Sequence, residues 1–326
     1  MTISEIAKMA GVSSAAVSRY LNNGSLSQQK RERIAKVIEE TNYQPSEYAR
    51  TMRTKKTKRI GVIVPQIDSE SSPEILSGIG SVMDQENYHV LLMNSNRCMS
   101  KELRMLETFQ QSQVDGLILA ASVLTEDHMR LLGQMQCPVV IVGQKCEEYS
   151  CVYHNDYQAS YEMMKYLLKS GNTNPAYIGV NRRDLSAGLN RYLAVKKALE
   201  EADIVMETIP CAEADFTIQS GKEAMRKLLM TGRKIDCLFC ATDMIAVGAI
   251  TCLREHGLRV PEDIRVSGIG HGLVADILTP QLTTVHFHYR TSGMEAARLL
   301  LEQIQNPQAE KKSRMLSYRM MFQGTA

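Results

Sequence analysis

The sequence of 326 residues predicts an α/β protein with a small all-α domain in front of it. Residues 2–22 have the pattern of two short helices joined by a turn, and short apolar runs alternate with amphipathic stretches from residue 60 onward. Residues 1–59 hold 12 Lys and Arg against 5 Asp and Glu, whereas residues 60–326 hold 26 against 31. These three observations indicate a small, basic amino-terminal domain followed by a larger, acidic α/β domain.

Residues 2–22 fit a helix-turn-helix, the motif whose second helix lies in the major groove of DNA. Thr2 and Glu5 match a capping box at the start of the first helix, and Ser13 can cap the second. Gly11 lets the chain turn sharply between them. An ordinary helical hairpin would also fit the spacing, but the caps and the turn together favour the DNA-reading motif.

The second helix has a packing face and a free face at helical spacing. A third helix is expected after Ser27, with Ile34, Val37 and Ile38 facing inward, so we assign a DNA-binding domain to residues 1–45. The packing face of the second helix holds Ala16, Val17, Tyr20 and Leu21. The residues expected to meet DNA are Ile3, Ser14, Ala15, Ser18, Arg19 and Asn22. A basic domain of this kind would bind phosphates in a salt-sensitive way.

Residues 46–59, SEYARTMRTKKTKR, are basic and only weakly helical. A segment of this composition can stay unfolded until it meets DNA. We interpret it as a linker that takes part in DNA binding, with a plain, protease-sensitive tether as the alternative.

From residue 60 onward, the alternation of apolar runs with amphipathic stretches predicts parallel strands with crossover helices on both faces. Two sheets are needed to place all the runs. A ligand would then bind in the cleft between them, at the carboxyl ends of the strands. The runs are RIGVIV, HVLLMN, GLILAA, VVIVG, PAYIGV, CLFCA and IRVSGIG.

Other classes of protein find little support in the sequence. Glu5 and Lys8 interrupt the first apolar segment and no long apolar window follows, so we expect a cytoplasmic protein with free cysteines and no membrane contact. Cys237 and Cys240 form a CxxC within an apolar run that reads as a buried strand. Cys146, Cys151 and His154 lack a second ligand pair, so no metal is expected. Walker A, GxSxG and HExxH motifs are absent and residues 268–272, GIGHG, lack the complete dinucleotide fingerprint, so neither an enzyme nor a cofactor is expected.

Several segments resemble the LacI/GalR-type bacterial repressors. They are AGVS, VSR and NN in the first 23 residues, NYQPSEYAR from residue 42, and then IGVIVPQIDS, VDGLIL, VVIVGQ, CATDMIAVGA and LTPQLTTV, which together cover essentially the whole chain. The resemblance implies two Rossmann-like subdomains of the periplasmic-binding-protein type, the amino one about 60–157 and 285–312 and the carboxyl one about 158–284 and 313–326. It also implies that the linker becomes a hinge helix that wedges into the DNA minor groove, where Ala49, Met52 and Arg53 occupy the matching positions.

The resemblance also implies a ligand site in the cleft. Arg191 matches an arginine that donates to effector hydroxyls, and Phe216 matches an aromatic residue that stacks on a sugar ring, although a core role for Phe216 is equally compatible with the sequence. Asp243 ends a strand and could bind hydroxyls or cap the next helix. Gln66 and Gln144 close two strands of the amino subdomain. The further lining candidates are Asp184, His271 and Tyr289.

The expected effector is a neutral sugar. The lactose-type repressor has Asp at the positions of Gly143 and Gly270, and trehalose-6-phosphate-type repressors have Arg at those of Gln66 and Gln144, so neither chemistry carries over. The chain is most similar to the sucrose-operon repressors of Gram-positive bacteria in VGQ, HNDYQA and the segment that follows GIGHG. We therefore expect a homodimer that binds a pseudo-palindromic operator and is released by sucrose or another fructose-containing sugar. A trehalose-type response or a corepressor-dependent regulator of the catabolite-control or purine type is the alternative. The carboxyl end is too short for the tetramerisation helix of the lactose repressor, so a dimer is expected rather than a tetramer.

Overall fold

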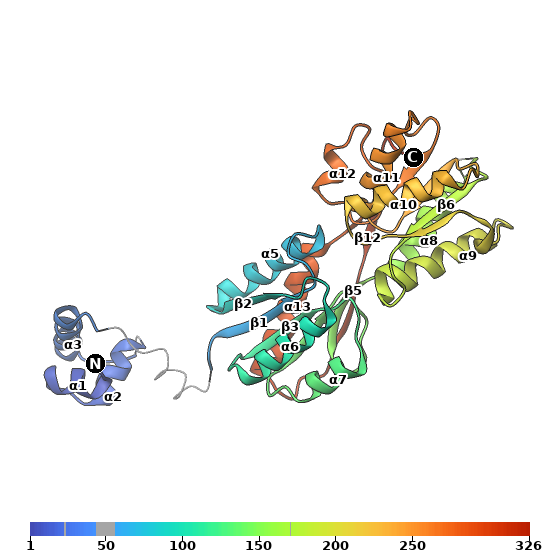
Figure 1. The fold of residues 1–326 in the computed structure, drawn as a ribbon. Coiled ribbons are helices and arrows are strands. Elements are labelled where there is room, and N and C mark those ends of the chain that lie inside the picture. Colours follow the sequence, from blue (N-terminus) through green and yellow to red (C-terminus); the bar gives the residue numbers. More distant parts are fainter. Residues whose placement is uncertain (23, 44–55, 170) are drawn as a thin grey trace. The chain divides into compact units, whose positions relative to one another are not determined.

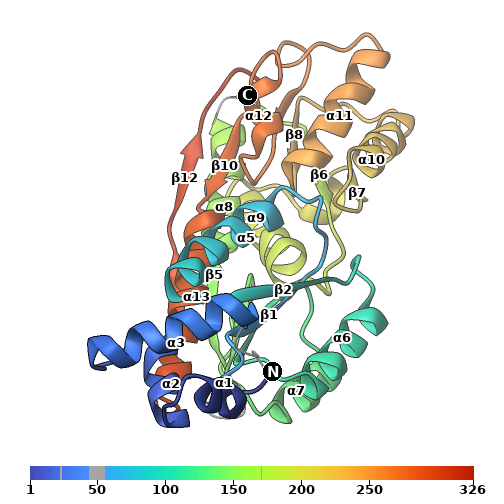
Figure 2. The same ribbon diagram turned by 90° about the vertical axis from the view of Figure 1, so that its left-hand side faces the viewer.

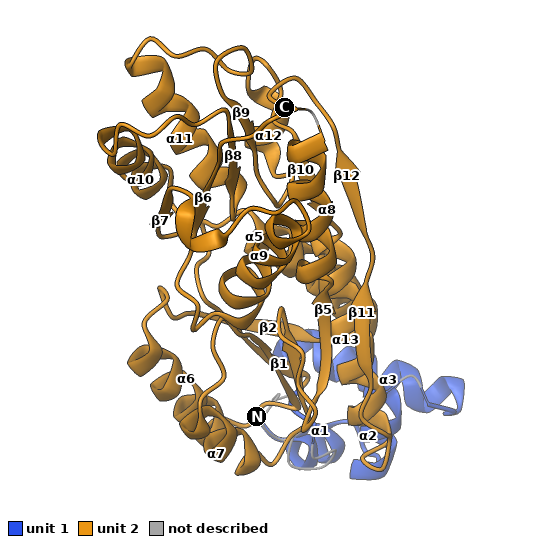
Figure 3. Cartoon of the chain, turned by 90° about the vertical axis from the view of Figure 1, so that its right-hand side faces the viewer, with its two compact units in different colours: residues 1–57 blue, residues 58–326 orange. Residues whose placement is uncertain are grey.

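The computed structural model describes residues 1–22, 24–43, 56–169 and 171–326, and the chain forms two compact units, residues 1–57 and 58–326 (Figure 3). Unit 1 is small and helical, and unit 2 is large and α/β, which confirms the predicted fold class. The boundary between the units falls inside the linker expected at residues 46–59. Ala49, Met52 and Arg53, the expected hinge contacts, lie outside the described residues.

Unit 1 contains α1 (Ile3–Met9), α2 (Ser14–Leu21) and α3 (Gln28–Thr41). The expected caps are present. The Glu5 amide donates to Thr2 Oγ1 and the Thr2 amide donates to Glu5 Oε2 at 2.7 Å, while Ser13 Oγ accepts from the Ala16 amide at 3.2 Å. Gly11 has a φ of +64°, so the turn uses the conformation that glycine adopts most readily.

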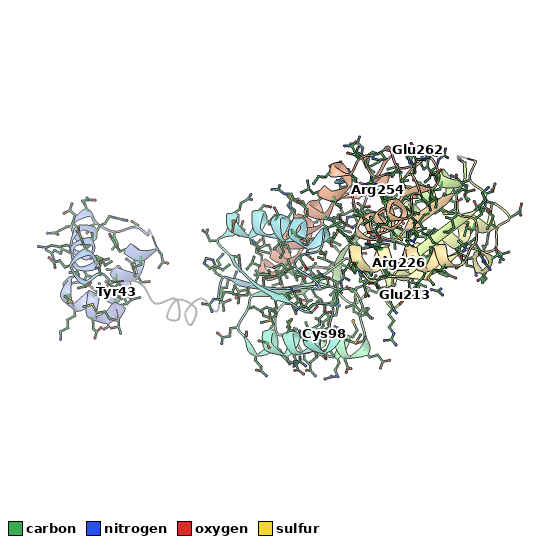
Figure 4. The ribbon with its side chains drawn as sticks, turned by 45° about the horizontal axis from the view of Figure 1, so that its top comes forward. Tyr43, Cys98, Glu213, Arg226, Arg254 and Glu262 are labelled. Atoms are coloured by element: carbon green, nitrogen blue, oxygen red, sulfur yellow. The ribbon has the colours of Figure 1, made fainter. Side chains whose placement is uncertain are left out.

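The core of unit 1 is made by one face of each helix. Ile6, Val17 and Ile34 are fully buried in it. Tyr43, which follows α3, is also buried in this cluster (Figure 4). Small cores of this size leave little stability in reserve, so the helix caps contribute a meaningful share.

Replacing Ser13 by alanine is expected to lower the free energy of unfolding of unit 1 by about 1 kcal/mol, because the Ala16 amide loses its acceptor. Urea unfolding of the full chain followed by circular dichroism measures the change. Ser14→Ala is the matched control, since Ser14 is exposed and is not the cap. An equal loss in both variants would contradict the capping role.

Unit 2 contains two parallel sheets, each covered by helices on both faces (Figure 1, Figure 2). The sheet of the amino subdomain has the order β11 (Ser313–Leu316), β5 (Ser150–His154), β4 (Val139–Val142), β3 (Gly116–Ala120), β1 (Arg59–Val64) and β2 (His89–Asn94). One face packs against α5 (Ser71–Met83), which runs into the 3-10 turn η1 (Asp84–Glu86), and α13 (Tyr289–Gln305). The other packs against α6 (Met99–Gln111) and α7 (Glu126–Gly133).

The carboxyl subdomain repeats this plan with four strands, β7 (Cys211–Glu213), β6 (Pro175–Gly179), β8 (Cys237–Cys240) and β9 (Arg265–Ser267). Its two faces are covered by α8 (Asp156–Lys169) with α9 (Arg191–Glu200), and by α10 (Ile218–Met230) with α11 (Asp243–Glu255). The CxxC cysteines lie fully buried in β8, as the apolar run predicted. The remaining short elements are the π-helix η2 (Leu185–Asn190), η3 (Met206–Thr208), α12 (Leu273–Ile277) and the antiparallel pair β10 (Thr284–Phe287) and β12 (Tyr318–Met321).

Paired helices approach closely where glycines face each other. A Cβ added to Gly78 of α5 would lie 2.1 Å from the Arg290 carbonyl oxygen, and one added to Gly293 of α13 would lie 2.0 Å from that of Ile75. The pair α10 and α11 makes the same kind of contact at Gly221 and Gly248. Each subdomain is therefore a tightly packed body.

The chain passes between the subdomains three times, after β5, after β10 and after β11. The sequence placed residues 313–326 in the carboxyl subdomain, but β11 extends the amino sheet by pairing in parallel with β5. The sequence also placed residues 285–287 in the amino subdomain, whereas Val285 and Phe287 of β10 pack in the carboxyl core. Both boundaries were missed because β10 and β11 are short and carry no long apolar run.

Candidate nucleic-acid interface and ligand cleft

Helix α2 has the two faces that its sequence predicts. Ala16 and Val17 are buried, and Tyr20 and Leu21 pack against the same core. On the opposite face, Ser14, Ala15, Arg19 and Asn22 are exposed, and Ser18 is half-buried. Ile3 is half-buried and packs against the core from the start of α1.

The exposed face of α2 has the chemistry of a DNA-reading surface. Ser14 and Ala15 are small and lie in the first turn, so they allow close approach to base edges. Arg19, near the end of the helix, offers a fork of donors suited to guanine or phosphate. The Asn22 side chain already donates to the Ser18 carbonyl at 2.6 Å, which leaves its amide oxygen to accept. The DNA contacts of these residues remain predictions.

A cavity of about 250 Å³ lies in unit 2, and residues of both subdomains line it. The side chains follow strand ends, as expected for a ligand site in an open α/β fold. The amino subdomain contributes Gln66 after β1, Arg97 after β2 and Gln144 after β4. The carboxyl subdomain contributes Asp184, Arg191 and Phe216. Tyr289, the first residue of α13, also lines the cavity.

Arg191, the first residue of α9, is the central charge of the cavity. It is buried and held by Asp156, whose Oδ1 accepts from Nε at 2.8 Å and from Nη2 at 2.6 Å, and its Nη1 donates to the Ala241 carbonyl. Burial raises the pKa of Asp156, and the charge of Arg191 opposes that shift. The guanidinium is therefore fixed in one orientation in the cavity wall.

Phe216 lies at the cavity with Arg97 stacked on it. The Arg97 guanidinium carbon is 3.6 Å from the centre of the Phe216 ring, and Arg97 Nε donates to Gln66 Oε1 at 2.9 Å. Phe216 also packs against the carboxyl core, which is one of the two roles that the sequence left open, and its stacking on a sugar ring stays a prediction. The stack joins the amino subdomain to the carboxyl subdomain across the cavity.

Two hydrogen bonds also cross between the subdomains. Ser186 Oγ donates to the Gly143 carbonyl at 2.6 Å, and Gln144 Nε2 lies 3.4 Å from Asp184 Oδ1. Asp184 in addition caps η2 through the Ala187 amide, and burial raises its pKa. A ligand with hydroxyl groups would meet donors and acceptors from both walls.

The base of the cavity is aromatic. His154 stacks on Phe287 with 4.6 Å between ring centres and meets Tyr289 edge to face at 5.4 Å. Burial, with the nearby charge of Arg191, lowers the pKa of His154 to about 3, so its ring is neutral at pH 7. His154 Nε2 is buried without a hydrogen-bond partner among the described residues, which leaves an acceptor or donor for a ligand.

Asp243 and His271 do not line this cavity, contrary to expectation. Asp243 is fully buried and accepts from Thr284 Oγ1 and from the His271 amide, both at 2.5 Å, so it fixes the loop after β9. Thr242, rather than Asp243, caps α11 through the Ile245 amide. His271 faces a second cavity, of about 1190 Å³, which shares Glu70 and Tyr289 with the first.

Sequence reasoning missed Arg97, His154 and Asp156 as cavity residues. His154 ends β5, Arg97 follows β2, and Asp156 follows β5 at the same spacing as Gln66 follows β1, so the rule that singled out Gln66 and Gln144 at strand ends could also have found them. The pairing of Asp156 with Arg191, 35 residues further along the chain, gave no local signal.

Two family models match the chain. Residues 2–46 match the model described as bacterial regulatory proteins, lacI family, and residues 164–325 match the periplasmic binding protein-like domain. No described helix is both long and apolar enough to cross a membrane.

Curated relatives match over almost their whole length. The sucrose operon repressor of Staphylococcus xylosus is 34% identical over 310 residues, which cover 95% of this chain and 96% of that protein. Catabolite control protein A of Priestia megaterium is 30% identical, with 99% and 98% covered. The HTH-type transcriptional repressor PurR of Histophilus somni strain 129Pt is also 30% identical, with 93% of this chain and 92% of that protein covered.

Solved structures share the fold. A complex of the transcriptional regulator CelR with cellobiose is 26% identical, with a TM-score of 0.77 and both chains fully covered. The lac repressor dimer bound to operator and the anti-inducer ONPF has a TM-score of 0.89 at 23% identity, with 100% and 98% covered.

Proposed function

Because the chain belongs to the LacI family of bacterial regulatory proteins, we propose that it is a homodimeric repressor whose operator affinity falls when a neutral sugar binds in the cleft of unit 2. The observation that supports this most strongly is the cleft itself, where a fixed arginine, two amides and an aromatic ring from opposite subdomains surround one cavity. Sucrose or another fructose-containing sugar is the favoured effector, in line with the repressor of the Staphylococcus xylosus sucrose operon.

The charges of the cavity favour a neutral ligand. Among the described residues, its lining contains the carboxyl groups of Asp68, Glu70, Asp156 and Asp184, and its cations are the guanidinium groups of Arg97 and Arg191. Arg191 is already paired with Asp156, so a phosphate would meet more negative than positive charge. Hydroxyl groups, by contrast, can use both carboxylates and amides.

Sugar binding would act on DNA through the arrangement of the subdomains. A ligand that contacts both walls changes how the amino subdomain lies relative to the carboxyl subdomain, and in a dimer this moves the two linkers that lead to the DNA-binding units. Linkage requires that operator DNA weaken sugar binding by the same factor.

Thermal shift of the purified protein with sucrose, fructose, trehalose and the corresponding sugar phosphates tests the proposal. The best ligand is then titrated against the protein bound to a pseudo-palindromic operator. A neutral sugar that stabilises the protein and releases DNA is the expected result. A ligand that tightens DNA binding would overturn the proposal.

A phosphorylated or corepressing ligand is the second candidate, and Arg97 is the observation that favours it. Its guanidinium lies in the cavity wall and would gain a strong partner in a phosphate. The match to catabolite control protein A and to PurR fits regulators of this second kind. The chemical class of the ligand that stabilises the protein and the sign of its effect on DNA binding together separate the two candidates.

Replacing Phe216 by leucine is expected to weaken sugar binding roughly tenfold, because a flat aromatic surface is lost from the cavity wall. Isothermal titration calorimetry with the identified sugar measures the change. Phe322→Leu is the matched control, since Phe322 stacks on Tyr166 and does not line the cavity. Equal affinities for Phe216→Leu and the control would contradict a role of Phe216 in binding.

A further inference from the structure

The glycine-rich segment at residues 268–272 has no role in the function proposed above. Its three glycines, Gly268, Gly270 and Gly272, occupy alternate positions after β9. At each of them a carboxyl group lies next to the position that a Cβ atom would occupy. A Cβ added to Gly268 would lie 2.3 Å from Asp243 Oδ1, and one added to Gly272 would lie 2.4 Å from Glu70 Oε1. Side chains at these positions would therefore displace the two acids.

The two acids come from opposite subdomains. Glu70 directly precedes α5 in the amino subdomain, and Asp243 begins α11 in the carboxyl subdomain. They meet at Gly270, where an added Cβ would lie 3.3 Å from Glu70 Oε2 and 3.4 Å from Asp243 Oδ2. Both oxygens are thus close to the same point, and two buried, ionised carboxylates there would repel each other, so the arrangement favours a proton on one of them.

Hydrogen bonds identify which acid carries the proton. Asp243 accepts from Thr284 Oγ1 and from the amides of His271 and Gly272, and three donors stabilise its charge. Glu70 Oε1 is buried without a partner among the described residues. Burial, and then the charge of Asp243, raise the pKa of Glu70 to about 8, whereas burial raises that of Asp243 to about 6.

The other ionisable groups around Glu70 come from each neighbouring element. His271 is tied to Asp276, with 3.2 Å between Nε2 and Oδ1, and burial lowers the pKa of His286. Arg254 of α11 (Figure 4) donates to the Thr279 carbonyl. Asp243 is thus the charged group that most directly affects the pKa of Glu70. Among the described residues, the ionisable groups around the two cavities that Glu70 lines are Asp68, Glu74, Arg97, His154, Asp156, Asp184, Arg191, Asp243, Arg254, His271, His286, His288, Tyr289 and Arg290.

We propose that Glu70 is a positioning residue that keeps its proton beside Asp243 and, by filling the space at Gly272, packs the amino subdomain onto the glycine segment of the carboxyl subdomain. The contact is strongest below about pH 4.5, where the carboxyl group of Glu70 is protonated both in the folded and in the unfolded chain. It weakens as the pH rises from about 4.5 to about 8, because separation of the subdomains then releases the proton, and it changes no further above that range.

A double-mutant cycle tests the contact. Gly272→Ala is expected to lower the unfolding temperature of unit 2 by roughly 4 °C in the presence of Glu70, because its Cβ takes the place of the carboxyl group. Gly272 has a φ of −77°, which suits alanine, so the backbone adds no strain of its own. In the Glu70→Ala background the same change is expected to cost less than about 1 °C. Equal losses in both backgrounds would overturn the proposal.

The proton is tested separately with Glu70→Gln, which keeps the shape and cannot ionise. Calorimetry of the full chain from pH 5 to pH 8.5 compares this variant with the wild type. The difference in unfolding temperature between wild-type unit 2 and the Glu70→Gln variant is expected to shift against the wild type as the pH rises to about 8. Above that pH the difference is expected to stay constant. Parallel curves over the whole range would show that Glu70 holds no proton there, and would likewise overturn the proposal.

Discussion

Replacing Arg191 by alanine is expected to abolish the response to sugar while operator binding persists. Arg191 is the fixed cation of the cavity wall, and its contacts lie within unit 2, so unit 1 keeps its DNA-reading face. The change also leaves Asp156 buried without its partner, at a cost of about 3–5 kcal/mol in the free energy of unfolding of unit 2. Operator affinity with and without sugar, measured by fluorescence anisotropy, gives the response.

Loss of stability and loss of binding are separated by removing the ion pair as a whole. In Arg191→Met combined with Asp156→Leu, no buried charge is left unpaired, so most of the stability is expected to return. The sugar response is not expected to return, because the donor fork is still missing. A double variant that responds normally to sugar would show that Arg191 has only a structural role.

Replacing Arg19 by alanine is expected to weaken operator binding by about 10- to 100-fold, because a base contact of this type contributes about 1–3 kcal/mol. The side chain is exposed on the free face of α2, so the stability of unit 1 should hardly change. Binding to operator and to unrelated DNA at several salt concentrations measures both the loss and its origin.

The two forms of contact differ in their salt dependence. Loss of a base contact lowers operator affinity more than affinity for unrelated DNA, whereas loss of a phosphate contact lowers both affinities and reduces the salt slope by about 1. Lys36→Ala is the matched control for charge, since Lys36 is an exposed cation on α3 that pairs with Glu40. Equal losses for Arg19→Ala and Lys36→Ala would show that Arg19 acts only through its charge.

The sequence predicted those parts of the fold that carry a strong local signal. Buried runs such as RIGVIV and CLFCA became β1 and β8, and the caps at Thr2 and Ser13 marked helix starts correctly. The strands β7, β10, β11 and β12 have three or four residues each and lie at edges or between the subdomains, so their apolar pattern is weak. Pairing between distant segments determines them, and one sequence contains no record of that pairing.

The candidate site shows the same division. Gln66 and Gln144 were found because they follow buried strands, which is local information. Asp243 lies at a strand end too, yet the glycine loop covers it, with the amides of His271 and Gly272 donating to its carboxylate. The position of Arg97 after β2 is local information as well, but its stack on Phe216, 119 positions away, is not.

The three passages of the chain between subdomains limit how a gene for this protein can be recombined. Because β11 belongs to one subdomain and β12 to the other, no continuous stretch of coding sequence between residues 58 and 326 encodes either subdomain alone. The junction near residue 57, by contrast, separates two units that each have their own core. Recombination between relatives would therefore keep unit 2 whole and exchange unit 1. A single crossover near residue 57 can in this way combine the ligand specificity of one relative with the operator specificity of another.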